Sequence, residues 1–120
     1  MGGPGIFRVK RIYEPPAEDD GYRVLVDRLW PRGVSKDKAR IDEWLKDVSP
    51  SDALRRATHA NPDDWDGFAT AYAAELKAEP AASAVRRLKE RLAAGPVTLL
   101  YAAKNEDRNN AVALAKLLDE

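Results

Sequence analysis

Apolar and polar residues follow two different periods along this chain, and these periods predict short strands and longer helices. The continuous β-prone run Val24-Leu25-Val26 predicts a buried strand over residues 23–29. Val97–Tyr101 is a second run of this kind. Residues 6–13 alternate roughly between apolar and polar positions, which predicts a half-buried strand at a sheet edge. The proline-rich, acidic segment 14–21 predicts a solvated loop.

Helical patterns occupy most of the rest of the chain. Ser35 predicts the N-cap of a short helix through Arg40, and Ser49-Pro50-Ser51-Asp52 resembles a capping box that opens a helix through about Thr58. Residues 61–64 give a further start signal, behind which one apolar stripe runs through Trp65, Phe68, Ala69, Tyr72 and Leu76. Another stripe, ended by Gly95-Pro96, predicts a helix over residues 81–92, and Asn105-Glu106-Asp107 predicts the cap of a final helix with a stripe through Ala111, Leu114, Ala115 and Leu118.

Residues 41–48 fit two structures. Ile41, Trp44, Leu45 and Val48 match a helical stripe, whereas a compact sheet needs another strand near this position. We favour a strand over residues 43–47.

Helical connections between short apolar strands predict an α/β fold. We expect residues 1–120 to form a single small three-layer Rossmann-like domain, with a mostly parallel sheet of about four strands and helices on both faces. Residues 1–5 are rich in glycine and proline, and we expect them to be disordered.

The most informative segment for function follows the first buried strand. There the apolar run breaks into Asp27, Arg28, Trp30, Pro31, Arg32 and Gly33. Charged residues and a turn at the carboxyl end of a strand are typical of binding sites in open α/β sheets. If the strand at 97–101 runs parallel to the first, Lys104 and Asn105 reach the same edge, where the final helix begins with its positive dipole end.

These residue types favour a negatively charged ligand. Arginine gives planar two-pronged contact to phosphate or carboxylate, and lysine supplies a point charge. Asp27 has three candidate roles: orienting an arginine, accepting a hydrogen bond from a ribose hydroxyl, or acting as the acid or base of a catalytic reaction. A purely structural alternative stays open, in which Asp27 pairs with Arg28 or Arg32 to brace the turn. Trp30 either covers the site or packs against a neighbouring helix.

Composition narrows the classes of function. The chain has 120 residues with twenty basic and twenty acidic side chains, so its formal net charge of zero argues against a nucleic-acid partner. The absence of cysteine excludes disulfides and thiolate chemistry. No apolar run approaches the roughly 18 residues of a membrane span, and no secretory leader is recognised, so we expect a soluble, cytoplasmic protein without a membrane partner. The basic residues Arg86-Arg87, Lys89 and Arg91, and the pair Arg55-Arg56, are typical of solvated helix faces.

Metal and cofactor chemistry has little support. His59 is the only histidine, so no transition-metal site is predicted, although a carboxylate site for Mg²⁺ stays open. The sequence has no glycine-rich phosphate loop and no dinucleotide fingerprint, so the cofactor, if there is one, stays unidentified, as does the oligomeric state.

Three blocks resemble a known family. Arg11–Pro16, the segment from Arg23 to Gly33 and Leu99–Lys104 resemble the YeaO-like branch of the bacterial family called domain of unknown function 488. The likeness covers nearly the whole chain, and it implies a small Rossmann-like α/β domain with a strand after the Ser35 helix. It supplies no reaction.

The chain departs from this family at two places. Relatives tend to carry histidine on both sides of the asparagine that follows Lys104, where this chain has Arg108 and Asn110 around Asn109. They also tend to have His-Asp-Pro where this chain has Ala60-Asn61-Pro62. Histidine- or metal-dependent chemistry is therefore not expected here.

We accordingly expect an α/β domain that binds a small anionic ligand at the carboxyl edge of its sheet. Asp27 is the candidate acid or base if the protein is an enzyme, a question that the sequence leaves open. The expected ligand-binding residues are Arg28, Trp30, Arg32, Lys104, Asn105 and Asn109. The alternative is a non-enzymatic module that binds a protein or a nucleic acid.

Overall fold

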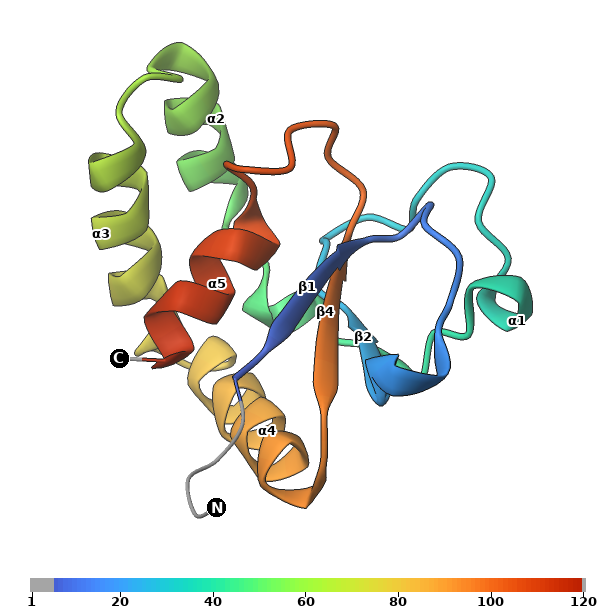
Figure 1. The fold of residues 1–120 in the computed structure, drawn as a ribbon. Coiled ribbons are helices and arrows are strands. Elements are labelled where there is room, and N and C mark those ends of the chain that lie inside the picture. The colour runs from blue at the N-terminus through green and yellow to red at the C-terminus, as the bar shows by residue number, and fades with distance from the viewer. Residues whose placement is uncertain (1–5, 120) are drawn as a thin grey trace.

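The computed structural model describes residues 6–119 and contains a four-stranded sheet in which all neighbouring strands are parallel (Figure 1). The strands are β1 (Arg8–Arg11), β2 (Tyr22–Leu25), β3 (Glu43–Trp44) and β4 (Val97–Tyr101), and their order is β1-β4-β2-β3. The predicted α/β class and mostly parallel sheet are therefore confirmed, and β1 lies at an edge as expected. The disorder expected for residues 1–5 falls outside the described residues.

Helices cover the two faces of the sheet unequally (Figure 1). The longer helices, drawn in green to red, lie on one side: α2 (Asp52–Ala60), α3 (Trp65–Leu76), α4 (Ala81–Ala94) and α5 (Asn110–Asp119). The other side carries, within residues 6–119, the short helix α1 (Lys36–Ala39), a 3₁₀ turn at Glu18–Asp20 and loops.

Side chains of β2 and β4 alternate between these two faces because the strand period is two. Val24 and Leu99 belong to the larger core cluster under the long helices. Leu25 and Leu100 belong to the smaller cluster, with Ile41 beside α1. Burial on both faces explains why these strands are continuous apolar runs rather than alternating ones.

Several element boundaries differ from the prediction because another side chain caps the helix. Ser35 and Ser51 cap α1 and α2 as expected. The cap of α3 is Asp64, whose carboxylate accepts the Gly67 N–H, rather than Asn61. The final helix begins only at Asn110, because Asn109 accepts the Val112 N–H. The strand expected over residues 43–47 is two residues long and is followed by a 3₁₀ turn.

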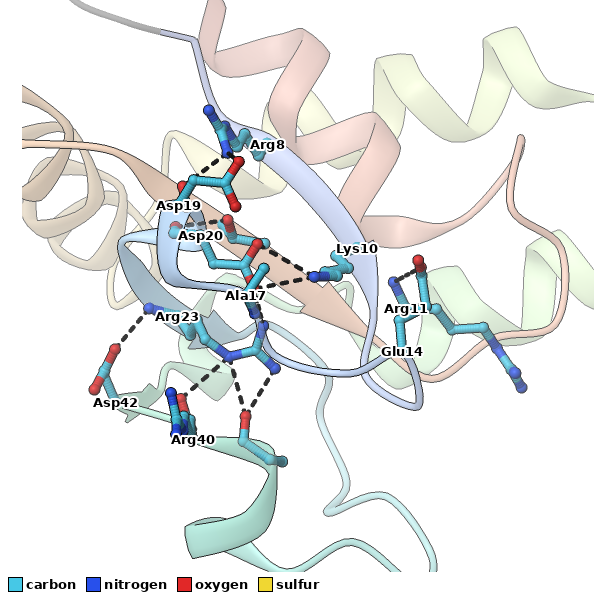
Figure 2. Close-up of polar contacts among 12 residues, drawn as sticks. Arg8, Lys10, Arg11, Glu14, Ala17, Asp19, Asp20, Arg23, Arg40 and Asp42 are labelled. Carbon is cyan, nitrogen blue, oxygen red and sulfur yellow. Dashed lines mark hydrogen bonds and ion pairs between the residues drawn. The ribbon is translucent and has the colours of Figure 1, made fainter.

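The segment predicted as a solvated loop, 14–21, contains a buried carboxylate, and in this respect the prediction is wrong. Asp20 is only 5% exposed and forms ion pairs with Arg23 and Lys10. Figure 2 shows both cations reaching Asp20, which also accepts the Ala17 N–H. Since α1 is too short to cover its face of the sheet, this loop folds over it and places Asp20 against Thr98 of β4, whose hydroxyl donates to the Asp20 carbonyl.

Gly21 joins this loop to β2 through a close approach that requires glycine. Its φ is +68°, and a Cβ at this position would lie 2.3 Å from the carbonyl oxygen of Pro96. The same carbonyl accepts the Tyr22 N–H at 2.9 Å. Gly21 therefore sets the register in which β2 lies alongside β4.

Candidate functional site

A cavity of about 370 Å³ lies at the carboxyl ends of β2 and β4. The loop after β2, the segment before α2, the middle and end of α2, the start of α3 and the loop before α5 form its walls. The residues that line it are Asp27, Arg28, Leu29, Trp30, Pro31, Ser49, Pro50, Arg55, Thr58, His59, Trp65, Phe68, Ala102, Ala103, Arg108, Asn109 and Asn110. Because β2 and β4 are parallel neighbours, segments 75 residues apart in the chain meet at this one edge.

Asp27 connects the two strand ends to the last helix. The chain leaves the sheet after Val26, whose N–H still donates to Leu100. The Asp27 carboxylate accepts the Ala102 N–H at 2.9 Å and the Asn110 side-chain amide at 3.1 Å. Its backbone carbonyl accepts the Trp44 indole N–H at 2.7 Å. These contacts hold the Asp27 carboxylate at the wall of the cavity.

Burial raises the pKa of Asp27 above its ordinary value of 3.8. The hydrogen bonds from Asn110 and Ala102 and the positive charge of Arg55 act in the opposite direction and offset part of this effect. In the described residues Asp27 forms no ion pair with Arg28 or Arg32, so the braced turn considered as a structural alternative is not what the structure contains. Asp27 is held by amide donors instead.

Three guanidinium groups line the cavity. Arg28 contacts Asp52 at 2.6 Å, and Arg55 contacts the same oxygen at 3.4 Å. Both ion pairs are about half exposed, so water weakens them. Arg108 has no carboxylate partner among the described residues, and its guanidinium lies 6.0 Å from the centre of the Trp65 ring. Three positively charged side chains therefore line the same cavity as the half-buried carboxylate of Asp27.

Aromatic rings form much of the apolar wall. Trp30 packs edge-on against Trp44 with ring centres 5.3 Å apart, and its indole N–H donates to Val34. Trp30 thus contacts the smaller core cluster and also lines the cavity. On the opposite wall, Trp65 lies 5.2 Å from Phe68.

The structure brings together some of the residues singled out in the sequence and separates others. Asp27, Arg28, Trp30 and Asn109 line the cavity, whereas Arg32, Lys104 and Asn105 do not. The Arg32 carbonyl accepts the Tyr13 hydroxyl, and Asn105 accepts two N–H groups of its own loop, those of Asp107 and Arg108. Asn109 is buried, and both ends of its amide are used in the cap of α5.

Sequence reasoning did not assign Arg55, Trp65, Arg108 or Asn110 to the site. Arg55 and Trp65 belong to helices whose approach to this edge no local pattern indicates. Arg108 lies in the loop after β4, and Asn110 is the first residue of α5. The parallel arrangement predicts that this segment reaches the same edge, so the sequence could have indicated both residues.

The surfaces outside the cavity offer fewer groups that could bind a ligand or a metal ion. On α4 the Arg86 and Arg87 guanidinium groups contact Glu79 and Glu43, so two of the four basic residues on this helix are paired with carboxylates. Within residues 6–119, His, Asp and Glu side chains do not gather in threes where they could hold a metal ion. Over the same range, every helix is too short or too polar to cross a membrane.

Comparison with known proteins gives a consistent family match. Residues 6–120 match the model of a family described as "Inactive DUF488-N3 subclade". The uncharacterised protein YeaO of Escherichia coli is 45% identical over 112 residues, which cover 93% of this chain and 96% of that protein. The uncharacterised protein Rv3073c of Mycobacterium tuberculosis is also 45% identical over 112 residues, covering 92% of its length. No solved structure gives a significant match.

Proposed function

Since the chain belongs to the inactive DUF488-N3 subclade, we propose that its cavity binds a small anionic ligand, a phosphate, a nucleotide or a carboxylate, without transforming it. The observation that carries this proposal is the position of Arg28, Arg55 and Arg108 around one cavity at the carboxyl edge of a parallel sheet. This is the edge at which α/β proteins bind their ligands.

An anion in the cavity would interact favourably with all three arginines, whereas the arginines interact unfavourably with one another. Guanidinium groups of like charge repel across a shared cavity, and an oxyanion between them removes that repulsion. Each can also offer two parallel N–H donors to a phosphate or a carboxylate. The start of α5 adds its positive dipole end at the same edge.

Two observations support binding rather than catalysis. Each Asp27 oxygen already accepts a hydrogen bond, from Asn110 or from Ala102, which limits its freedom to exchange protons with a ligand. Arg108 and Asn110 stand where the family resemblance led us to expect histidines, and both line the cavity. Positive charge and an amide thus occupy positions where a proton-transfer group would otherwise lie.

Thermal shift measurements with inorganic phosphate, nucleotides and small carboxylates test the proposal. We expect saturable stabilisation of the wild-type chain by at least one class and a weaker response for Arg55→Ala and Arg108→Ala. Arg56→Ala is the matched control, because Arg56 is the exposed neighbour of Arg55 on α2 and does not line the cavity. A response that Arg56→Ala weakens as much as Arg55→Ala would contradict the assignment.

The competing function is that of a non-enzymatic module that binds a protein or a nucleic acid. Gel retardation of DNA or RNA that is salt-sensitive and lost on Arg86→Ala, together with no stabilisation by any small anion, would replace our proposal with it. The ion pairs of Arg86 and Arg87 favour the small ligand. The cytoplasmic location expected from the sequence stays a prediction.

A further inference from the structure

We infer that the ligand is a nucleoside monophosphate, with its phosphate on the arginines, a hydrogen-bond donor on Asp27 and its ring against Trp65. This inference rests on the proposed anion-binding function and specifies its ligand. It follows from the three kinds of group that line one cavity, namely guanidinium groups, a carboxylate and an aromatic ring.

The first argument is the half-buried carboxylate of Asp27 at the cavity wall. Its negative charge opposes a bound anion, and phosphate alone does not compensate for this repulsion. A carboxylate has about four acceptor positions, and the hydrogen bonds from Ala102 and Asn110 account for two. A ligand that carries hydroxyl or amino donors besides its anionic group satisfies the others.

The second argument is the arrangement of Trp65 and Arg108. At 6.0 Å from the ring centre, the Arg108 guanidinium is at the outer limit of a cation–π contact, about 6 Å. Arg108 is exposed, so it can turn toward a phosphate without breaking an ion pair recorded in the described residues. The face of Trp65 then becomes a platform on which a planar base can stack.

The third argument is size. Ligand pockets generally measure about 300–1,000 Å³, and this cavity, at about 370 Å³, is at the lower end. Such a volume suits one base, one sugar and one phosphate, and it is too small for a dinucleotide. Leu29 and Pro31 also line the cavity and supply apolar surface, which favours a ring over a wholly polar sugar phosphate.

Isothermal titration calorimetry separates the three contributions. The probes are inorganic phosphate, ribose 5-phosphate, adenosine, uridine and the 5′-monophosphates of these two nucleosides. We expect a monophosphate to bind roughly tenfold more tightly than phosphate or ribose 5-phosphate, because base stacking adds to the phosphate contacts.

Variants assign each part of the ligand to its residue. Trp65→Leu should reduce monophosphate affinity to that of ribose 5-phosphate and leave phosphate binding unchanged. Arg108→Ala should weaken the monophosphate roughly tenfold and leave the nucleoside unaffected. Asp27→Asn should weaken the nucleoside but not phosphate, because it removes a negative charge that opposes the anion. Because Trp65 also packs on Phe68, circular dichroism must show that Trp65→Leu is folded, and exposed Arg108 provides a variant that does not disturb the core.

The outcomes distinguish the inference of a nucleotide ligand from the broader proposal that the cavity binds an anion. If phosphate binding depends on Arg108 but monophosphates bind no more tightly than ribose 5-phosphate, the nucleotide inference is wrong. The proposal of an anion site is then retained. Tight binding of a small carboxylate in place of any nucleotide overturns it as well. No binding of any of these probes or of a small carboxylate overturns both.

Discussion

Asp52 contacts two of the three arginines that line the cavity, and it therefore competes with any anion for them. Its carboxylate oxygen lies 2.6 Å from Arg28 and 3.4 Å from Arg55. An incoming phosphate has to share or break these contacts. If the cavity binds an anion as proposed, Asp52 at the start of α2 should therefore weaken that binding.

Asp52→Asn should accordingly strengthen phosphate binding. Releasing two half-exposed ion pairs should lower the dissociation constant roughly threefold, since such pairs contribute about 0.2–1 kcal/mol each. Calorimetry at low ionic strength measures the change. Glu79→Gln is the control, because it releases Arg86 from a comparable exposed pair that lies outside the cavity. Equal effects of the two variants would mean that only net charge matters.

The protonation of Asp27 gives a second prediction at the scale of single residues. Burial raises its pKa, and the hydrogen bond from Asn110 and the charge of Arg55 lower it. Removing either of the two should therefore raise the pKa of Asp27 further. Carboxyl-carbon NMR titration of the wild type, Asn110→Ala and Arg55→Ala measures this, with Arg56→Ala as the control. A lower pKa of Asp27 in Asn110→Ala would contradict the geometry.

At the scale of elements, the sequence predicted whether each segment is a helix or a strand more accurately than it predicted the residue at which the segment begins. The apolar runs Val24-Leu25-Val26 and Val97–Tyr101 identified the central strands because burial on both faces requires such runs, although the first strand ends at Leu25 and not at Leu29 as predicted. The cap of the last helix was misplaced because Asn105 and Asn109 carry the same capping side chain, and local sequence does not say which of them faces the helix. Only the packing of α5 on β1 and β4 decides between them.

Asn109→Ala should therefore destabilise the protein more than Asn105→Ala does. The buried Asn109 side chain accepts the Val112 N–H and donates to the Asn105 carbonyl, and loss of a helix cap typically costs about 1 kcal/mol of unfolding free energy. Asn105 is exposed, and its contacts lie within its own turn. Urea denaturation of the two variants compares them. A larger loss for Asn105→Ala would restore the sequence-based cap.

At the scale of the whole molecule, charged side chains gather in two places: the cavity at the carboxyl edge of the sheet and the Asp20 cluster on the face that carries α1. Parallel strands and helical crossovers were predictable, and with them the meeting of Asp27 and the loop after β4 at one edge. The contributions of Arg55 and Trp65 were not predictable, because they depend on how α2 and α3 pack. The buried Asp20 was also missed, since an acidic loop with two prolines is a solvated loop in most proteins.

The Asp20 cluster supplies the last prediction, which concerns acid stability. Burial alone would raise the pKa of Asp20, but the N–H of Ala17 and the cations of Lys10 and Arg23 together hold it below its ordinary value of 3.8. A carboxyl whose folded pKa is depressed contributes stability that is complete above the unfolded pKa and is lost as pH falls through the folded one. Asp20 should thus support the fold at neutral pH and cease to do so in strong acid.

Asp20→Asn tests this on the whole chain. At pH 7 it should lower the unfolding free energy by about 3 kcal/mol, because Arg23 is left buried without its partner. The gap between wild type and variant should shrink below pH 4 and close once Asp20 is protonated in the folded state too. Asp19→Asn, which removes an exposed pair with Arg8, is the matched control and should change little. Urea unfolding from pH 7 to pH 2.5 records both. If the difference in unfolding free energy between wild type and variant stays constant with pH, Asp20 contributes through packing rather than through its charge. The face of the sheet that carries α1 would then be stabilised by packing alone.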